Sequence, residues 1–453
     1  MQDAGGPTVG ERFELGRCLD LGAMKVGVIG LGYVGLPLAV AFAEAGCDVV
    51  GVDADVRRVE RLQRGESDVE DVSSQELASL AERLAVTDRY PDLASCDAVL
   101  ICVPTPLATG REPNLSYVVD SATRLSRVLH EGRLVVLEST TYPGTTRDRV
   151  LPILEESGLG AGTGFNLAFS PERIDPGRSD HTLRTTPKVV GGLTDACRSR
   201  AAELYRLICD EVVEVSSPEV AEMTKLVENI YRSVNIAMVN ELAQLCDRME
   251  ISVWEVLEAA ETKPFGFNRF DPGPGMGGHC LPIDPFYLAF KARQHDFYTE
   301  FIELAGKINQ SQPLFCVRKI ERTLNEAALA TRGSRILLLG VSYKEGIGDL
   351  REAPALKIVK ELRKLGADVS YHDPHVPELP ELGLASVPLS DGLADCDLAC
   401  IITAHPEIDY ERVAREALLV LDLRGVTRRI DSENIARLGE GGRRAKPVSR
   451  LDE

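Results

Sequence analysis

The chain has 453 residues, 44% hydrophobic and 27% charged, which are ordinary values for a globular protein of two or three domains. A formal net charge of −19 argues against a nucleic-acid partner, and no apolar run approaches the roughly 20 residues that a membrane-spanning helix needs. The 11 scattered cysteines form no CxxC pair and no signal peptide precedes them, so we expect reduced thiols and a cytoplasmic protein without a membrane partner.

The first part of the chain predicts a dinucleotide fold. Residues 1–23 are rich in glycine and charge and are expected to be a disordered extension. A short apolar run at 25–29 leads into the glycine turn Gly30-Leu31-Gly32-Tyr33-Val34-Gly35, a helical stretch at 36–45, and a second apolar run at 48–52 that ends at Asp53. This strand, turn, helix and strand spacing is typical of a dinucleotide-binding unit. Further strands are expected at 98–103, 134–138 and 166–169.

The glycine turn can be interpreted as a cofactor-binding turn or as a turn with a purely structural role. Gly30, Gly32 and Gly35 would let backbone N–H groups and the positive end of the helix approach a pyrophosphate. Asp53 would bind both ribose hydroxyls and repel a 2′-phosphate, which favours NAD over NADP. The alternative is a glycine turn that packing alone requires.

The centre of the chain predicts one long helix. No glycine occurs between 192 and 266, and apolar residues keep helical spacing from 220 to 249, which is about 30 residues or roughly 45 Å. Such a helix is expected to join two domains and to face a second subunit. Lys225 and Asn229 lie one turn apart on it, where an ammonium and an amide could stabilise an oxyanion, although such residues are more often at a solvated surface.

A loop rich in glycine and proline follows, Gly273-Pro274-Gly275-Met276-Gly277-Gly278-His279-Cys280-Leu281-Pro282-Ile283-Asp284-Pro285. Cys280 is a candidate nucleophile with Asp284 as a candidate base, and its alternative role is a small buried hydrophobic residue. The histidines form no ligand set of accepted spacing, so no metal is expected.

The last third repeats the first in outline. A strand at 336–340, a helix at 355–365 and a strand at 368–372 resemble the opening unit, and the segment 396–403 resembles 96–103. In this copy Gly340-Val341-Ser342-Tyr343-Lys344 replaces the glycine turn and Arg351 follows, which suits a different phosphate ligand such as a nucleoside-diphosphate sugar. Surface cations without a ligand are the alternative.

The predicted fold class is therefore α/β, with two Rossmann-like doubly wound domains joined by a central long-helix domain. The expected divisions are a dinucleotide domain at 24–212, a central helical domain at 213–325 and a C-terminal sugar-nucleotide domain at 326–453.

Several long motifs in order resemble the nucleotide-sugar 6-dehydrogenases, the family that oxidises UDP-glucose, UDP-N-acetylhexosamines and GDP-mannose. The resemblance spans about residues 24–425. It rests on the glycine turn, the Cys280 loop and the motifs Val103-Pro104-Thr105-Pro106, Glu138-Ser139-Thr140-Thr141-Tyr142-Pro143-Gly144-Thr145, Ser170-Pro171-Glu172-Arg173, Ala221-Glu222-Met223-Thr224-Lys225-Leu226, and Asp349-Leu350-Arg351-Glu352.

The resemblance implies a role for each matching residue. Cys280 would be the nucleophile, Lys225 and Asn229 would hold the C6 oxygen, and Asp284 and Glu172 would act as acid and base with a water that Thr140 positions. The resemblance also implies cofactor contacts from the glycine turn with Tyr33 and Val34, and from Asp53, Pro104, Thr105, Thr140 and Arg351. Substrate contacts would come from Glu172, Arg173, Lys225, Asn229, Phe270, Gly275, Gly277 and Lys344, and Lys263 would reach the partner subunit's sugar site.

The implied reaction is a four-electron, NAD-dependent oxidation of the C6 alcohol to a uronic acid through a thiohemiacetal and a thioester on Cys280, and the expected assembly is a homodimer or a higher homo-oligomer. The loops at 170–177 and 262–267 look closer to the N-acetylhexosamine branch, and UDP-glucose and dTDP-glucose stay possible. Two alternatives are a two-electron β-hydroxyacid-type dehydrogenase and a non-catalytic sugar-nucleotide sensor.

Overall fold

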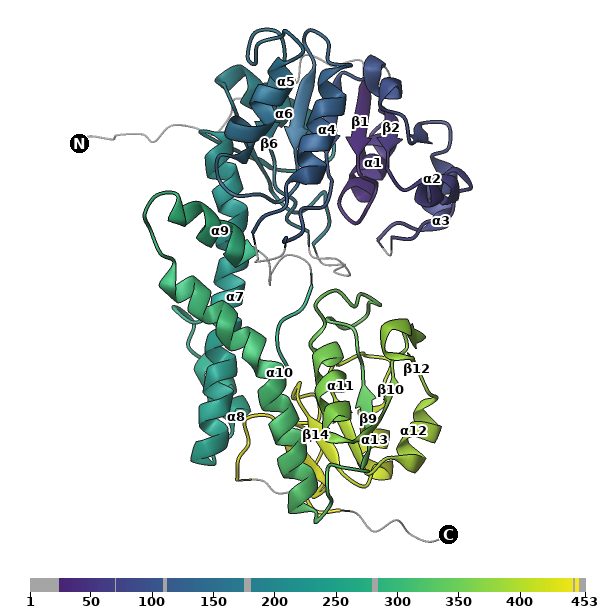
Figure 1. The fold of residues 1–453 in the computed structure, drawn as a ribbon, viewed down its shortest axis with the longest axis vertical. Helices are drawn as coiled ribbons and strands as arrows, with labels where there is room; N and C mark the ends of the chain where they lie inside the picture. Colours follow the sequence, from purple (N-terminus) through teal and green to yellow (C-terminus); the bar gives the residue numbers. More distant parts are fainter. Residues whose placement is uncertain are drawn as a thin grey trace, which may run out of the picture.

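The computed structural model describes residues 24–69, 71–108, 112–174, 181–278, 284–442 and 445–447. Two sheet domains lie one above the other, and the long helix α7 (Pro218–Met249) runs along one side of both (Figure 1). The extension expected at 1–23 and the candidate nucleophile Cys280 both fall outside the described residues. Within those residues, no helix combines the length and the apolar character that crossing a membrane would require.

The N-terminal sheet has eight strands in the order β3-β2-β1-β4-β5-β6-β7-β8, and its first six strands have the order of a dinucleotide-binding fold. Neighbouring strands pair in parallel except β6 with β7. The strands are β1 (Lys25–Ile29), β2 (Asp48–Val52), β3 (Leu84–Thr87), β4 (Ala98–Ile101), β5 (Leu134–Leu137), β6 (Asn166–Phe169), β7 (Lys188–Gly192) and β8 (Val212–Val215). The helices are α1 (Gly35–Glu44), α2 (Val56–Gln63), α3 (Ser74–Ser79), α4 (Ser116–Ser126), α5 (Leu151–Glu155) and α6 (Asp195–Tyr205), with a 3-10 helix η1 (Tyr90–Ser95) and a π-helix η2 (Thr146–Val150).

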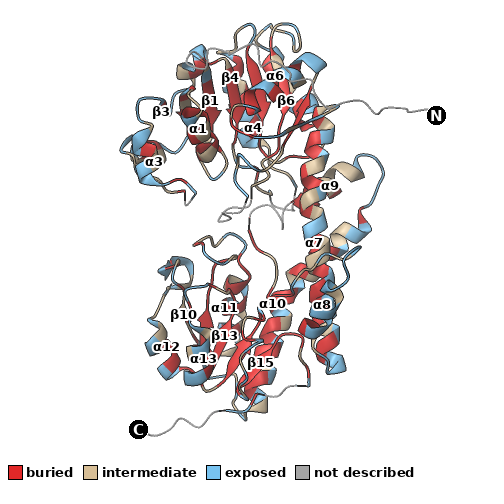
Figure 2. Cartoon of the chain, turned by 180° about the vertical axis from the view of Figure 1, so that it is seen from behind, coloured by how far each residue is buried: buried red, intermediate tan, exposed pale blue. Residues whose placement is uncertain are grey.

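The sheet is buried on both faces because its strands are apolar at successive positions. Side chains alternate between the two faces of a strand, and Val26 and Val28 of β1 join one core with α1 and α6. Val99 and Ile101 of β4 join a second core with α4 on the opposite face. Figure 2 shows the strands buried between helices in both domains. This double burial explains why the strand segments are almost continuous hydrophobic runs.

The C-terminal sheet has five parallel strands in the order β10-β9-β13-β14-β15. They are β9 (Arg335–Leu339), β10 (Asp368–His372), β13 (Leu398–Ile401), β14 (Val420–Asp422) and β15 (Ile435–Arg437), with a small hairpin of β11 (Glu378–Leu379) and β12 (Leu384–Ala385). The helices of this domain are α11 (Pro354–Leu365), α12 (Leu389–Asp395), α13 (Tyr410–Glu416) and the 3-10 helix η3 (Pro380–Leu382).

The internal repeat predicted from the sequence extends to individual hydrogen bonds. Asp97 accepts the backbone N–H of Lys25 at 2.8 Å, and Asp397 accepts that of Arg335 at 2.8 Å in the second copy. Likewise, the acidic residue after the second strand accepts the N–H that follows the first glycine: Asp53 from Leu31 at 2.8 Å, and Asp373 from Val341 at 2.7 Å. The two sheet domains are therefore two versions of one design, which confirms the predicted fold class.

The helical centre consists of α7, α8 (Val253–Glu261), α9 (Asp284–Arg293) and α10 (Glu300–Glu326). The 32 residues of α7, about 48 Å long, match the helix expected at 220–249. Ser217 caps its start through Val220 N–H at 3.4 Å. Ala221 packs into the core of the N-terminal domain and Ala243 into that of the C-terminal domain, so one helix belongs to both cores.

Candidate active site

The glycine turn combines two structural glycines with one that leaves space. Gly30 has φ +90°, and a Cβ there would lie 2.8 Å from the carbonyl oxygen of Cys102. A Cβ on Gly35 would lie 1.8 Å from the carbonyl oxygen of Gly30, whereas a Cβ on Gly32 would meet nothing within 4 Å. No side chain caps the N-terminus of α1, which begins at this turn. The turn thus offers an open, positively polarised helix end that fits the pyrophosphate of NAD.

Asp53 lies beside this turn and is mostly buried, with 8% of its surface exposed. Its carboxylate accepts the N–H groups of Leu31 and Asp55 at 2.8 and 2.9 Å. Arg58 could otherwise attract a 2′-phosphate, but it is paired with Asp68 at 3.1 Å and lies 3.7 Å from Asp53. This arrangement fits a ribose with free hydroxyls, as expected from the sequence.

Parallel pairing brings the other predicted cofactor residues to the same edge of the sheet. Ile29 pairs with Ile101 and Ile101 with Leu137, so the segments after β1, β4 and β5 leave the sheet side by side. After β4, Thr105 follows Pro104 and its hydroxyl donates to the carbonyl oxygen of Thr140 at 2.8 Å. Tyr287 of α9 donates to the carbonyl oxygen of Thr105 at 2.6 Å. These contacts join α9 to the loops that carry Pro104, Thr105 and Thr140.

Three of the predicted catalytic residues form a buried cluster between α7 and α9. Asn229 donates to the Asp284 carboxylate at 2.5 Å. Lys225, Asn229 and Asp284 are only 8%, 5% and 2% exposed. Burial raises the pKa of Asp284 to about 6, and the nearby Lys225 and the hydrogen bond from Asn229 oppose that rise. No hydrogen bond joins the Lys225 ammonium to another side chain that the structure describes, which leaves it able to bind an added oxygen.

Glu172 faces this cluster from the end of β6. Its carboxylate accepts the N–H groups of Arg173 and Ile174 at 2.7 and 2.6 Å, and Lys188 lies 3.4 Å away. Burial acts to raise its pKa, but Lys188, the two N–H groups and Lys225 together bring the pKa below its usual value. The Arg173 side chain is engaged by Glu228 at 2.7 Å, so it lies next to α7.

The segment with Cys280 is anchored on both sides of the undescribed residues. Gly278 donates its N–H to the carbonyl oxygen of Arg351 at 2.9 Å, and Asp284 is bound by Asn229. A Cβ on Gly277 would lie 2.5 Å from the Cβ of Tyr343, and one on Gly275 3.2 Å from Pro313. The glycines at 275 and 277 thus lie against α10 and the C-terminal domain, whereas the position of Cys280 stays a prediction.

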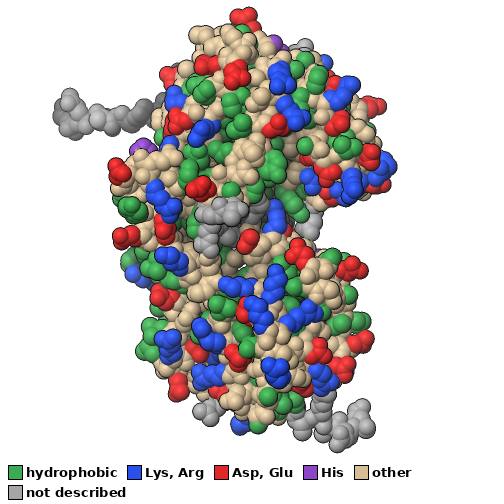
Figure 3. Space-filling view, in the orientation of Figure 1, with side chains coloured by type: hydrophobic (Ala, Val, Ile, Leu, Met, Phe, Trp, Pro, Cys, Tyr) green, Lys and Arg blue, Asp and Glu red, His purple; other side chains and the backbone are tan. Residues whose placement is uncertain are grey.

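The two sheet domains meet at the glycine turn. The Arg351 guanidinium lies 4.8 Å from the centroid of the Tyr33 ring and is paired with Asp349 at 2.5 Å. Lys344 follows β9, and its carbonyl oxygen accepts the Ser342 hydroxyl at 2.7 Å. Figure 3 shows the surface hollowed between the two sheet domains. Arg351 is therefore placed beside the predicted cofactor turn, and Lys344 at the matching turn of the second copy.

Two further predicted substrate residues contact aromatic rings. The Lys263 ammonium lies 5.1 Å from the centroid of the Phe265 ring on an exposed loop. Phe270 packs edge-on against Tyr231, with ring centroids 5.8 Å apart. Among the described residues, no hydrogen bond or ion pair connects Lys263 with the cluster around Asp284, which is compatible with its expected position in a partner's site.

One group of side chains has the spacing of metal ligands although no metal was expected. Atoms of His375, His405 and Glu407 lie within 4.8 Å of one another. However, His405 accepts the Gly346 N–H through Nδ1 and contacts Asp373 through Nε2 at 3.1 Å. Both ring nitrogens are occupied, so His405 is better explained as a structural residue of the turn.

Several groups that hold this site together were not predicted from the sequence. Lys188 lies between Glu138 and Glu172, and Glu222 accepts three hydrogen bonds from the loop at 144–146. Tyr287 links α9 to the loop after β4. A lysine at the start of the otherwise apolar segment Lys188-Val189-Val190-Gly191-Gly192 was a usable signal, because a buried lysine is rare unless it is paired.

Comparison with known proteins accounts for all three parts of the chain. Residues 24–209 match the NAD binding domain of the UDP-glucose/GDP-mannose dehydrogenase family, residues 219–311 its central domain and residues 337–429 its UDP binding domain. A UDP-N-acetyl-D-glucosamine 6-dehydrogenase of Pseudomonas aeruginosa is 38% identical over 78% of this chain and 83% of its own. A UDP-N-acetyl-D-mannosamine dehydrogenase of Pyrococcus horikoshii is 36% identical over 86% of this chain and 93% of its own.

Solved structures show the same architecture. The structure of the UDP-D-ManNAc dehydrogenase from Pyrococcus horikoshii has a TM-score of 0.84 at 32% identity and covers 92% of this chain and 100% of its own. A UDP-glucose dehydrogenase from Pyrobaculum islandicum also has a TM-score of 0.84, at 27% identity, and covers 95% of this chain and 100% of its own. The enzyme class, the NAD cofactor and the family expected from the sequence are therefore confirmed. The chain belongs to the UDP-glucose/GDP-mannose dehydrogenase family.

Proposed function

We propose that the protein oxidises the C6 alcohol of a UDP-N-acetylhexosamine to the uronic acid in two successive steps on one active site. The observation that carries this proposal is the buried cluster of Lys225, Asn229 and Asp284. In this cluster the Lys225 ammonium, which has no hydrogen bond to any described side chain, lies near the Asp284 carboxyl, whose pKa is raised. Such a combination suits a reaction in which an alcohol loses a proton and a tetrahedral oxyanion forms.

Different residues of the cluster are proposed to stabilise charge and to transfer protons. NAD, when bound at the glycine turn, accepts the hydride that leaves C6 in each of the two steps. Lys225 and the Asn229 amide are assigned to the C6 oxygen, where they stabilise negative charge. Asp284, with a pKa of about 6, can release and take up a proton near neutral pH.

The second half of the reaction needs a nucleophile and a base. Cys280 is proposed to capture the aldehyde as a thiohemiacetal, which is then oxidised to a thioester. Glu172 is proposed to take a proton from the water that hydrolyses this thioester, and Thr140 to position the water. The lowered pKa of Glu172 supports this role, because only the ionised carboxylate can accept a proton.

The sugar nucleotide is assigned to the C-terminal domain and the loop before Cys280. The match to a UDP binding domain favours uridine, and the names of the relatives favour an N-acetylated sugar. Lys344 is proposed for the diphosphate, and Gly275 and Gly277 for the close approach of the loop to the sugar. Arg173 and Phe270 are proposed as further contacts.

A substrate panel tests the proposal. The protein is incubated with NAD and UDP-N-acetylglucosamine, UDP-N-acetylmannosamine, UDP-glucose, dTDP-glucose or GDP-mannose, and reduced cofactor and uronate are both measured. We expect two reduced cofactors for each sugar oxidised, with an N-acetylated sugar giving the highest kcat/KM. One reduced cofactor with free aldehyde, together with full activity of Cys280→Ala, would favour the two-electron dehydrogenase instead. No reduced cofactor with any sugar would favour a sensor.

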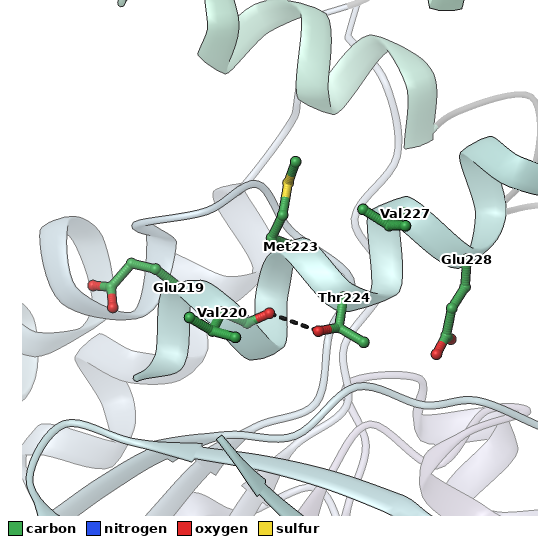
Figure 4. A pocket seen from close by; sticks show the side chains of 6 residues that line it. All are labelled: Glu219, Val220, Met223, Thr224, Val227 and Glu228. Atoms are coloured by element: carbon green, nitrogen blue, oxygen red, sulfur yellow. Dashed lines mark hydrogen bonds between the residues drawn. The ribbon is translucent and has the colours of Figure 1, made fainter. Parts of the chain in front are cut away.

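We also propose that the protein is a homodimer formed through α7. Exposed apolar side chains recur along one stripe of this helix at intervals of three or four residues, with one interval of seven: Val220, Met223, Val227, Tyr231, Met238, Leu242, Leu245 and Met249. In Figure 4, Val220, Met223 and Val227 lie along the groove at the start of the stripe, between Glu219 and Glu228. A row of exposed apolar side chains along one face of a helix is typical of an interaction surface, and a second copy would cover it with the same stripe.

Sedimentation of the wild type and of Val227→Glu tests this assembly. We expect a dimer that the charge dissociates, whereas Arg412→Glu on the distant helix α13 serves as a matched surface control. A wild type that sediments as a monomer at micromolar concentration would contradict the proposal. The cytoplasm is the proposed compartment, because none of the nine cysteines that the structure describes is in a disulfide bond, and thiols are the form that a reducing compartment favours.

A further inference from the structure

A buried ion network lies directly behind Glu172. Lys188 begins β7, and its ammonium lies 2.9 Å from one oxygen of Glu138 and 3.4 Å from Glu172. The Tyr205 hydroxyl donates to the other oxygen of Glu138. The side chains of Lys188 and Glu138 are 3% and 0% exposed, against 13% for Glu172. Only Glu172 therefore reaches the edge of the network that faces the proposed active site.

The antiparallel strand explains how a lysine comes to lie there. β5 and β6 run in parallel and end at Leu137 and Phe169, so Glu138 and Glu172 follow them at the carboxyl ends of the two strands. β7 runs the opposite way, with Phe169 paired to Gly191, which brings its first residue to this same edge. A parallel strand would have presented its last residue instead.

The charges in the network do not cancel. One ammonium serves two buried carboxyl groups, and Glu172 helps to raise the pKa of Glu138. Lys225 approaches from α7, and burial raises the pKa of the further titratable neighbours Cys102, Cys209 and Tyr205. Burial raises the pKa of Glu138, whereas Lys188 and other neighbours keep that of Glu172 low. Lys188 is therefore the group whose loss would most change the charge of Glu172.

We infer that Lys188 is a positioning residue that holds the Glu172 carboxylate ionised and aimed at the hydrolytic water, a role that rests on the proposed function. In the assigned step, the water oxygen bonds to the thioester carbon and one water proton passes to Glu172. The carbon–sulfur bond then breaks, its electron pair stays on the Cys280 sulfur, and the uronic acid is released. Without the ammonium of Lys188, the pKa of Glu172 would rise, so in mildly acidic solution more of the carboxyl groups would hold a proton and could not accept another.

A purely structural role for Lys188 makes a different prediction. Its shorter contact is with Glu138, so the lysine could serve only to neutralise that fully buried carboxylate. Removing the lysine alone would leave Glu138 buried and unpaired, which can unfold the domain. Lys188→Met combined with Glu138→Gln removes both charges, while the Tyr205 hydroxyl can still donate to the amide oxygen of the glutamine.

The experiment compares the wild type with Lys188→Arg and with the double variant Lys188→Met/Glu138→Gln. Thermal unfolding, the pH dependence of kcat and the intact mass of the enzyme during turnover are measured. We expect the double variant to unfold at a temperature close to that of the wild type and to accumulate a covalent sugar-nucleotide adduct. The acidic limb of its pH profile should move upward by about one pH unit, which is a roughly tenfold loss of kcat at pH values below the limb. Lys188→Arg keeps the charge and should restore the wild-type limb.

Wild-type kcat and no adduct in the double variant would show that Lys188 only neutralises Glu138, and would overturn the inference. An arginine variant with the same adduct and the same displaced limb as the double variant would overturn it as well, because the charge would then not matter. The wild type measured in parallel separates this result from the proposed function: if it makes no uronate, the function itself is wrong.

Discussion

The three glycines of the cofactor turn provide a matched pair of substitutions. Gly35→Ala places a Cβ 1.8 Å from the Gly30 carbonyl oxygen, 3.0 Å from its carbonyl carbon and 3.1 Å from the Cys102 Cβ. Gly32→Ala, only three residues away, places the same methyl group in open space. Chemically identical changes should therefore have opposite effects on folding and on cofactor binding.

The geometry sets the expected size of each effect. Carbon atoms pack best at roughly 3.5 Å, so α1 must move by more than about 1 Å to accept the methyl group of Gly35→Ala, and such overpacking typically costs about 1–3 kcal/mol, occasionally more. Gly32 lies outside the left-handed region, so alanine there should leave stability unchanged or raise it by about 0.4–1 kcal/mol. Its methyl group would instead fill the space assigned to the pyrophosphate, and we expect NAD to bind at least about tenfold more weakly, or about 1.4 kcal/mol.

Two assays separate the effects. Chemical denaturation without cofactor gives the free energy of unfolding, and calorimetric titration with NAD gives the dissociation constant. Wild-type NAD binding by Gly32→Ala would show that the open space beside Gly32 does not hold the pyrophosphate. Wild-type stability of Gly35→Ala would contradict the predicted clash, because a side-chain rotation cannot relieve a 1.8 Å approach to a backbone atom.

Three further predictions concern the supports of the candidate site. Tyr287→Phe removes the donor to the Thr105 carbonyl and should lower the free energy of unfolding by about 1–3 kcal/mol in denaturation, with Tyr298→Phe on an exposed loop as control. Glu222→Gln replaces one of the two accepting carboxylate oxygens with an NH2 donor that faces a backbone N–H, so the loop at 144–146 should gain faster amide exchange, and unchanged protection would contradict the assignment. The Asp284 pKa of about 6 lies above the usual value, so the folded state binds this proton more tightly. Relative to Asp284→Asn, the free energy of unfolding of the wild type should therefore fall as pH rises from about 4 to about 6, by at most about 1.4 kcal/mol per pH unit. A rise over that range would show that the pKa of Asp284 is lowered and not raised.

The elements of the fold were predictable where local pattern and tertiary burial agree. The strand expected at 166–169 and the helix expected at 220–249 correspond to β6 and to α7. The antiparallel strand β7 was not predicted, because the apolar run at 188–192 has the same pattern in either direction. Only the return path after β6 decides its orientation, and that orientation brings Lys188 to the site.

Site residues divide in the same way. Lys225 and Asn229 could be paired in advance, because one helical turn separates them on a single element. The contact of Asn229 with Asp284 joins residues 55 positions apart, and no spacing rule supplies it. Glu222 and Tyr287 were missed for a similar reason, since their partners lie on other elements and their types are ordinary for helices.

The internal repeat explains why one half-fold can serve two ligands. Asp53 and Asp373 accept the same backbone N–H in their copies, but Asp373 also contacts the buried His405, whereas Asp53 lies beside an open glycine turn. The second copy has therefore filled the position that is proposed to bind a ribose in the first, and we expect a ligand there to be held by the turn with Lys344 instead.

The relative placement of the two turns follows from α7, which belongs to both cores. Asn229 contacts Asp284 near the N-terminal domain, and Asn240 accepts the Gly273 N–H where the loop passes to the C-terminal domain. Eleven residues of helix separate these contacts by about 16 Å, a fixed distance because a helix does not stretch. The long helix thus fixes the distance between the cofactor turn and the proposed sugar-nucleotide turn. An insertion in it should uncouple the two sites even where each still binds its ligand.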